Sequence, residues 1–264
     1  MNKKVGFIGC GNMGSALIRA AVATAGPEGI LISDADRKKT KALAGETGVR
    51  IENTEILAKE AGMIFLGVKP QQLDGLLAEI RPVLECRRDR FVLVSMAAGV
   101  TIDRLQKTVG KWPVIRIMPN LAAAVGEGVI LYAEKDASGA DMETFVGIMK
   151  RAGELCALDE KLMDAGMALT GCGPAFVYMF IEALADAAVS LGIPRSHAYR
   201  LASQTVLGSA KLQLTSGKPP AELKDAVCSP GGTTIEGVLS LEKNGFRAAV
   251  SEAVLESYKK TKSI

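Results

Sequence analysis

Short apolar runs alternate with segments of helical periodicity through the first part of the chain. The runs lie at 4–9, 30–33, 63–70, 91–99, 114–120 and 128–133, and several of them are followed by segments with apolar residues at helical spacing. Strands that alternate with helices typically form right-handed βαβ units, whose strands are parallel. The pattern therefore predicts a doubly wound α/β domain, built on a parallel sheet, over residues 1–159.

After residue 159 the pattern changes to long helical segments. Residues 163–193, 194–217 and 245–260 are typical of helices, and Gly, Pro and Ser separate them. The segment FVYMFIEALADAAV is apolar around most of its circumference, and a domain of about 105 residues has little interior in which to bury it. We therefore expect residues 160–264 to form an all-helical domain that packs against a second copy of the chain, as a homodimer or a larger assembly.

Composition narrows the class of protein. Hydrophobic residues make up 48% of the chain, charged residues 23%, and the formal net charge is +3, which argues against nucleic acid or a membrane surface as the main partner. The five cysteines are scattered without a Cys-x-x-Cys pair, so neither a disulfide framework nor a metal site is indicated. The longest apolar runs fall short of the roughly 20 residues that span a bilayer, and the start of the chain has no leader pattern. We expect a cytoplasmic protein with no metal, membrane or nucleic-acid partner.

The segment Gly9–Gly14, GCGNMG, fits the pattern G-x-G-x-x-G directly after the first predicted strand and at the start of a helical segment. In that context the glycines allow a tight turn, close approach of a pyrophosphate and close packing of helix on strand, while the helix N-terminus offers N–H donors to phosphate. The alternative, a glycine-rich turn that binds nothing, does not account for this position in the first strand–helix turn. The motif predicts a Rossmann-type dinucleotide-binding domain.

The residues after the second predicted strand leave the choice of dinucleotide open. Asp34 lies 20 residues after Gly14, where an acid binds the ribose hydroxyls of NAD. Ser33 and the three cations at 37–39 surround it, and a nearby Arg accommodates the 2′-phosphate of NADP. We take NADPH as the expected cofactor, with NADH as the alternative.

Two further loops end predicted strands. Residues 67–70 (GVKP) and 97–99 (AAG) follow the apolar runs that begin at 63 and 91. Ligands of open α/β sheets lie outside the carboxyl ends of the strands, so these loops are expected to border the nicotinamide, and small residues at 97–99 would admit a flat ring. Ordinary strand-to-helix turns explain each loop equally well when it is taken alone.

A strong general acid or base is not evident in the sequence. The one histidine, His197, lies next to arginines at the start of a helical segment and is expected to face solvent. Tyr258 and Lys262 have a Tyr-x-x-x-Lys spacing, but they lie in a charged tail and the match is attributed to chance. Most reactions that transfer hydride to a carbonyl need such a group. Addition of hydride to a protonated C=N bond does not, because the iminium carbon is already electrophilic.

Residues 228–242, CSPGGTTIEGVLSLE, interrupt a helical region with Ser-Pro-Gly-Gly. Pro and Gly cost a helix interior about 3 and about 1 kcal/mol relative to Ala, so this break needs a reason. Either a plain turn between helices or a ligand-binding loop would explain the break.

The chain resembles pyrroline-5-carboxylate reductases. The resemblance rests on GFIGCGNMGSA, on TGCGPAFVYMFIEALADAAVSLGIPR and, most specifically, on ELKDAVCSPGGTTIEGVLSLE, with VKP, AAGVT and MPN in order between the first two. It implies an N-terminal Rossmann domain with a helical C-terminal dimerisation domain. It also implies reduction of 1-pyrroline-5-carboxylate to L-proline, the last step of proline synthesis, with NADPH or NADH, in dimers that often assemble into decamers.

Carried over by position, the resemblance assigns residues to two sites. The expected cofactor-binding residues are Gly9, Cys10, Gly11, Asn12, Met13, Gly14, Ser33, Asn53, Val68, Lys69, Pro70, Ala97, Ala98 and Asn120. The expected substrate-binding residues are Glu160, Ser229, Gly231, Gly232, Thr233 and Thr234.

Within the resemblance, the Ser-Pro-Gly-Gly break becomes a substrate loop. Backbone N–H groups of Gly231, Gly232 and Thr233 at the start of a helix would cradle the substrate carboxylate. Glycine exposes such donors, and Pro230 stiffens the approach. Thr234 is the expected catalytic residue, with a hydroxyl that positions the imine rather than acting as a strong base.

Two other functions are weighed against this one. A β-hydroxyacid dehydrogenase also begins with a glycine-rich turn and has a helical second domain, but it needs a catalytic Lys after a glycine-rich approach, and none follows Gly171 up to residue 180. A nucleotide-binding sensor without catalysis is the second alternative, and the intact Ser229–Thr234 loop argues against it.

Overall fold

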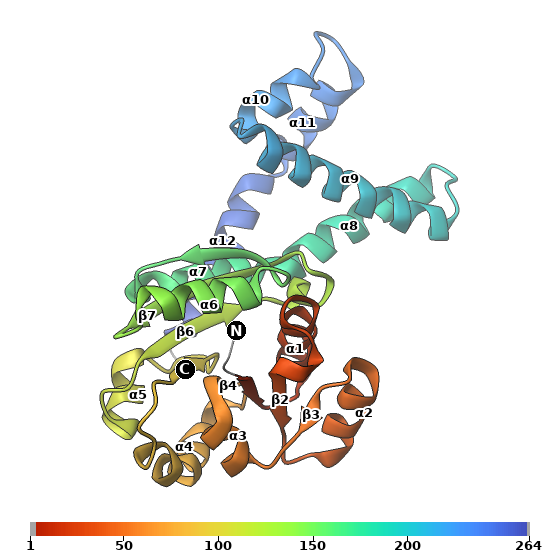
Figure 1. Ribbon diagram of the computed structural model, residues 1–264. Coiled ribbons are helices and arrows are strands. Elements are labelled where there is room, and N and C mark those ends of the chain that lie inside the picture. The colour runs from red at the N-terminus through yellow and green to blue at the C-terminus, as the bar shows by residue number, and fades with distance from the viewer. Residues whose placement is uncertain (1–3, 263–264) are drawn as a thin grey trace. The chain divides into compact units, whose positions relative to one another are not determined.

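The structure, a computed structural model, describes residues 4–262. They divide into two compact units (Figure 1). The first runs to Gly171 and includes the last described residues from Lys260, and the second is Cys172–Lys259. Met163 packs with Met118 and Leu131 of the sheet, so the residues just after 160 associate with the first unit. The expected functional boundary between residues 159 and 160 stays a prediction.

The first unit is built on a sheet whose strand order is β3-β2-β1-β4-β5-β6-β7-β8. The strands are β1 (Lys4–Ile8), β2 (Ile30–Ser33), β3 (Arg50–Ile51), β4 (Ala61–Leu66), β5 (Val92–Ser95), β6 (Val114–Pro119), β7 (Gly128–Lys135) and β8 (Gly153–Ala157). The first six strands follow the order typical of dinucleotide-binding sheets and are all parallel. β7 is antiparallel to β6, since only a short 3₁₀ turn, Leu121–Val125, connects them and a parallel crossover needs a dozen or more residues.

Helices cover both faces of this sheet (Figure 1). They are α1 (Asn12–Ala25), α2 (Arg37–Thr47), α3 (Thr54–Glu60), α4 (Pro70–Glu85), α5 (Ile102–Val109), α6 (Gly139–Met149) and α7 (Met163–Thr170), with further 3₁₀ turns at Pro27–Gly29 and Glu160–Leu162. The second unit contains α8 (Gly173–Ser190), α9 (Arg195–Ser216), α10 (Pro220–Ala226), α11 (Thr233–Lys243) and most of α12 (Phe246–Thr261). The sequence pattern did not indicate the short elements β3, α3 and β8.

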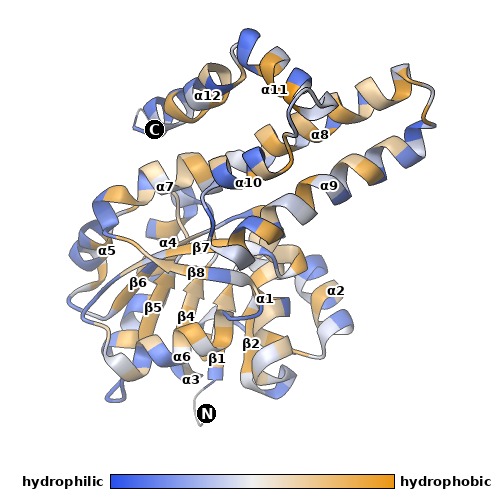
Figure 2. Ribbon diagram, turned by 90° about the horizontal axis from the view of Figure 1, so that it is seen from above, coloured by the Kyte–Doolittle hydropathy of each residue, from blue (hydrophilic) through white to orange (hydrophobic). Residues whose placement is uncertain are grey.

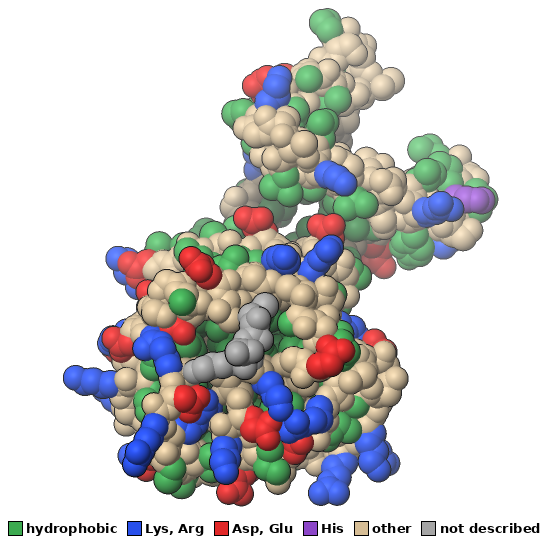
Figure 3. Space-filling model, in the orientation of Figure 1, with side chains coloured by type: hydrophobic (Ala, Val, Ile, Leu, Met, Phe, Trp, Pro, Cys, Tyr) green, Lys and Arg blue, Asp and Glu red, His purple; other side chains and the backbone are tan. Residues whose placement is uncertain are grey.

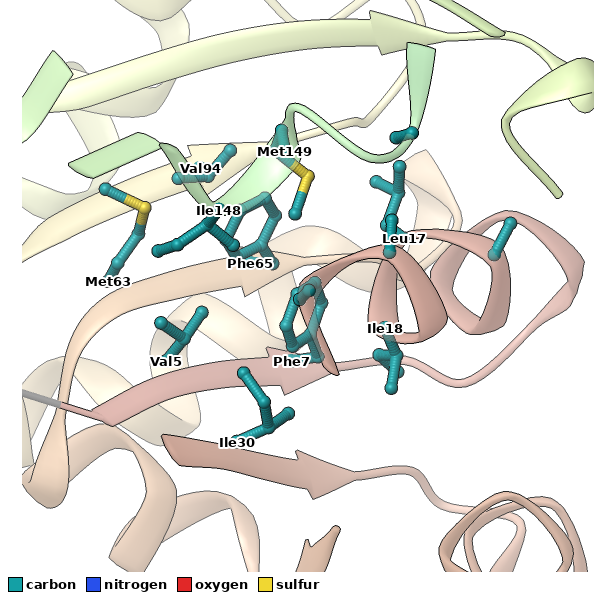
Figure 4. Packing of buried hydrophobic residues seen from close by; sticks show 14 of the residues in the cluster. Val5, Phe7, Leu17, Ile18, Ile30, Met63, Phe65, Val94, Ile148 and Met149 are labelled. Atoms are coloured by element: carbon teal, nitrogen blue, oxygen red, sulfur yellow. The ribbon is translucent and has the colours of Figure 1, made fainter. Parts of the chain in front are cut away.

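The core of the first unit lies in two clusters, one on each face of the sheet. Along β4, Met63 and Phe65 belong to the cluster with α1 and α6, while Ile64 and Leu66 belong to the cluster with α3, α4 and α5. The Phe65 ring stacks on Phe7 of β1 at a centroid distance of 4.4 Å (Figure 4). Burial on both faces explains why the strands read as continuous apolar runs, and they appear orange in Figure 2.

The second unit buries little of its apolar surface. Ala185, Ala198 and Ala202 form the small interface between α8 and α9, while larger side chains such as Met179 and Leu214 stay exposed. Figure 3 shows hydrophobic side chains, in green, on the surface of these helices. By length and composition alone, the helical stretch Glu160–Ser190 would suffice to cross a membrane, and little of it is buried. The expectation that no segment is apolar enough to span a bilayer is therefore not confirmed. Such exposed faces equally suit a protein partner.

Candidate active site

The carboxyl ends of the parallel strands bring together the residues expected to bind a nucleotide. β3, β2, β1, β4, β5 and β6 are adjacent and parallel, so the segments after them emerge at one edge of the sheet (Figure 1). In that order the edge carries Asn53, Ser33, Gly9–Gly14, Val68–Pro70, Ala97–Ala98 and Asn120. Ligands of open α/β sheets bind at this edge. The fold thus places every expected cofactor residue on the side where a dinucleotide would lie.

The three glycines of the G-x-G-x-x-G loop have different surroundings. Gly9 has φ +110°, and a Cβ on it would lie 2.5 Å from the carbonyl oxygen of Gly67. A Cβ on Gly14 would lie 2.1 Å from the carbonyl oxygen of Gly9, so the close approach of α1 to β1 requires glycine there. A Cβ on Gly11 would meet nothing within 4 Å. Gly9 and Gly14 therefore serve the fold, whereas Gly11 keeps a space open beside the loop.

The N-terminus of α1 faces this space with its donors available. Gly11 is the N-cap residue, no side chain caps the helix, and the first turn contains no acidic residue. The first N–H groups of a helix have no partner inside the helix and attract anions. The loop and helix together fit the pyrophosphate of a dinucleotide.

Cys10 in the loop is chemically inert. Burial, together with the smaller effect of the Asp34 charge, raises the pKa of its thiol to about 12, and Lys39 partly opposes this shift. The thiolate is the reactive form of cysteine, so this thiol is not a nucleophile near neutral pH. Any role of Cys10 in binding comes from its backbone and its size.

The Asp34 carboxylate is fixed against the glycine loop. Its Oδ2 accepts a hydrogen bond from the Cys10 N–H at 2.6 Å, and its Oδ1 accepts one from the Asp36 N–H at 2.8 Å. Next to it, Ser33 is buried, and its hydroxyl shares a hydrogen bond with that of Thr54 at 3.1 Å. The Asp34 carboxylate thus lies beside the glycine loop, at the edge where a nucleotide would bind.

The loops after β4 and β5 differ in the side chains that they carry. After β4 come Val68 and Lys69, and Lys69 is exposed at the N-cap of α4. After β5, Ala97 is buried, Ala98 is exposed, and Gly99 has φ +72°. The loop at 97–99 therefore contains little side-chain bulk that would keep a flat ring away from the backbone.

Two expected cofactor residues have structural hydrogen bonds of their own. The Asn53 Oδ1 caps α3 by accepting from the Ile56 N–H at 2.7 Å. The Asn120 side chain is buried, donates to the Thr170 carbonyl at 3.0 Å and accepts from the Val129 N–H at 3.1 Å. Both shape the edge of the site, and their contact with a cofactor stays a prediction.

Glu160, expected to meet the substrate, belongs to an ionic cluster. Its Oε1 accepts from the Ile102 N–H at 2.7 Å and from the Arg116 guanidinium at 3.1 Å. Arg116 lies in the middle of β6 with its side chain only 3% exposed, and it also contacts Asp164 at 3.2 Å. Because Ile102 begins α5, directly after the loop at 97–101, Glu160 fixes the helix that follows the expected nicotinamide loop.

In the second unit, the Ser-Pro-Gly-Gly segment forms a tight turn before α11. The Gly232 N–H donates to the Ser229 carbonyl at 3.0 Å, and Gly231 has φ +67°, a conformation that favours glycine. Gly232 is the N-cap of α11, which has no side-chain cap. The Gly232 N–H is therefore used inside the turn, and the donors left for a ligand are those that the start of α11 cannot pair, including Thr233.

Comparison with known proteins covers the whole chain. Residues 160–264 match the family "Pyrroline-5-carboxylate reductase dimerisation", and residues 4–99 match "NADP oxidoreductase coenzyme F420-dependent". The pyrroline-5-carboxylate reductase of Escherichia coli is 41% identical over 269 aligned positions that cover 100% of this chain and 99% of that protein. The chain belongs to the pyrroline-5-carboxylate reductase family.

Solved structures of the family agree with this fold. Plasmodium falciparum pyrroline carboxylate reductase with NADP bound is 34% identical, covers 99% of this chain and 98% of its own, and superposes with a TM-score of 0.86. The enzyme from Coxiella burnetii is 28% identical with a TM-score of 0.92, over 100% of this chain and 98% of its own. The expected family, the Rossmann sheet with a helical dimerisation domain, and the NAD(P)-dependent oxidoreductase class are confirmed, and nothing supports the dehydrogenase or sensor alternatives.

The sequence pattern did not indicate the roles of Arg116 and Asp164. One signal was available: an Arg in the apolar run VIRIMP must find a charged partner if that strand is buried on both faces. The identity of the partners, 44 and 48 residues later, was not readable from the pattern.

Proposed function

We propose that this chain reduces 1-pyrroline-5-carboxylate to L-proline with a nicotinamide dinucleotide as hydride donor, the last step of proline synthesis. The observation that carries the proposal is the open space at Gly11 before the uncapped start of α1, in a chain of this family. The bound dinucleotide would supply the hydride, which adds to the carbon of the protonated C=N bond, and the electron pair of that bond passes to the nitrogen, which becomes the secondary amine of proline.

The cofactor would be held along the carboxyl edge of the sheet. Gly9–Gly14 and the start of α1 would bind the pyrophosphate, Ser33 and Asn53 the adenosine side, and Val68–Pro70, Ala97, Ala98 and Asn120 the nicotinamide side. NADPH is the donor that the sequence led us to expect, with NADH as the alternative, and the Plasmodium relative has NADP bound. The position of Asp34 bears on this choice.

The substrate carboxylate would bind at the turn before α11. The N–H groups at the start of that helix, together with the positive end of its dipole, favour an anion. Gly231 and Thr233 would contribute backbone donors, and the Ser229 and Gly232 pair would hold the turn. The exposed Thr234 hydroxyl would position the imine nitrogen, because a protonated imine needs orientation more than it needs a base.

Glu160 would bind the substrate only through a carboxylate oxygen that its present hydrogen bonds do not use. One of its oxygens accepts from both Ile102 and Arg116, so the other oxygen is the one that remains for a ligand. We propose that the main role of Glu160 is to support the nicotinamide loop, and that contact with the substrate is its lesser role.

The assembly is proposed to be a homodimer that associates further into a decamer, in the cytoplasm, with a small molecule as the ligand and without nucleic-acid or membrane partners. The match to a dimerisation family and the exposed apolar side chains of α8 and α9 support the dimer.

The first test is oxidation of NADPH and NADH with racemic pyrroline-5-carboxylate, against a control without the imine. Imine-dependent oxidation with formation of L-proline is the expected result. Folded protein that binds nucleotide and oxidises neither donor would refute the proposed reaction.

A further inference from the structure

The carboxylate of Asp34 occupies the place where the two dinucleotides differ. Asp34 directly follows β2, and its Oδ2 accepts from the Cys10 N–H at 2.6 Å, inside the glycine loop. Its Oδ1 accepts from the Asp36 N–H at 2.8 Å. With both oxygens held by backbone donors, the side chain has one orientation before any ligand binds.

This orientation leaves acceptor capacity for a ribose. An ionised carboxylate offers about four acceptor sites, and the two backbone donors use two of them. The remaining two match the 2′- and 3′-hydroxyls of an adenosine ribose, which an acid at the end of the second strand binds in NAD enzymes. A 2′-phosphate is mostly doubly charged at neutral pH and would meet a like charge at short range.

The nearby cations belong to the start of α2 rather than to the loop that holds Asp34. The residue directly after Asp34 is the uncharged Ala35. Arg37, Lys38 and Lys39 lie in the first turn of α2, where the Asp36 carboxylate accepts from the Lys38 N–H at 2.9 Å and lies 3.9 Å from the Lys39 ammonium. Two carboxylates therefore share this segment with the three cations.

We propose that Asp34 makes this chain prefer NADH over NADPH. The inference rests on the proposed dinucleotide site and differs from the sequence expectation of NADPH, because the sequence did not reveal the hydrogen bonds that fix the carboxylate. Hydrogen bonds to a charged group and the avoided repulsion correspond to a preference of roughly 10- to 100-fold.

Equilibrium binding of NADH and NADPH to the full chain tests the proposal without any substrate. The ratio of the two dissociation constants is measured by fluorescence titration for the unchanged protein, for Asp34→Asn and Asp34→Ser, and for Asp36→Asn. Asp36→Asn is the matched control, since it removes one negative charge two residues away and Asn still caps α2. We expect tighter NADH binding in the unchanged protein, a shift of at least about tenfold toward NADPH in the Asp34 variants, and little change of the ratio in the control.

Equal or tighter binding of NADPH by the unchanged protein would overturn the proposal, whether or not the variants fold. An unchanged ratio in folded Asp34 variants, or a shift as large in Asp36→Asn, would overturn it too. Failure to bind either nucleotide would refute the dinucleotide site and this inference with it. Preferential NADH binding without imine reduction would support the role of Asp34 while refuting the proposed reaction.

Discussion

Glu160→Gln tests whether the Glu160 carboxylate is chiefly a structural anchor. The Arg116 guanidinium is 3% exposed and has two carboxylate partners, at 3.1 Å from Glu160 and 3.2 Å from Asp164. An amide in place of Glu160 removes one of these charges and weakens the acceptor for the first N–H of α5. The hydrogen bond that ties the helix after the expected nicotinamide loop to residues after β8 is then weaker.

The size of the effect follows from burial. Removing one partner of a fully buried ion pair costs about 3–5 kcal/mol. Here Asp164 remains as a partner and the Glu160 side chain is 28% exposed, so we expect a loss of about 2 kcal/mol in the free energy of unfolding. For a chain of this length that corresponds to a decrease of Tm by about 4–8 °C.

The assay combines thermal unfolding with steady-state kinetics. Asp159→Asn is the matched control, because Asp159 is the neighbouring acid and forms its ion pair with Lys161 at the surface, where losing the charge should leave the stability nearly unchanged. We expect Glu160→Gln to lower Tm well below that control and to raise the KM for the imine only modestly. A Tm equal to that of the control, with a large rise in KM, would show that the carboxylate serves the substrate and would refute the structural reasoning.

Three further predictions use the glycines and the thiols. Gly11→Val should fold normally and lose NADH and NADPH binding. Gly14→Val should unfold at a clearly lower temperature, because its Cβ would lie 2.1 Å from a backbone oxygen. Equal effects on binding and stability in both variants would contradict the different roles of the two glycines. Gly232→Val should raise the KM for the imine steeply and leave the nucleotide dissociation constant nearly unchanged, because the new side chain crowds the turn before α11. Unaltered kinetics would show that this turn does not bind the substrate. Iodoacetamide at neutral pH should modify the exposed Cys86 and leave Cys10 unmodified, since burial raises the pKa of the Cys10 thiol to about 12. Labelling of Cys10 before Cys86, measured by mass spectrometry, would contradict this prediction.

The sequence alone determined the parts of this protein that depend on neighbouring residues in the chain. The apolar runs located six of the strands, because strands buried on both faces must be apolar throughout. Gly9, Gly11 and Gly14 were recognisable because their spacing within one strand–helix turn carries the function of each. The break at Ser229–Gly232 was visible for the same reason, since Pro and Gly interrupt helices locally.

The tertiary structure decided what depends on partners far apart in the chain. Glu160 reaches the Ile102 N–H across 58 positions, and Asp34 reaches the Cys10 N–H across 24. Periodicity tells which face of an element is buried, but it does not tell which donor a buried or half-buried carboxylate will find. For that reason the pattern indicated Asp34 only as one acid among cations, and the resemblance placed Glu160 with the substrate, whereas the fold supplied the hydrogen bonds on which the proposed roles of Asp34 in nucleotide choice and of Glu160 in the support of α5 are based.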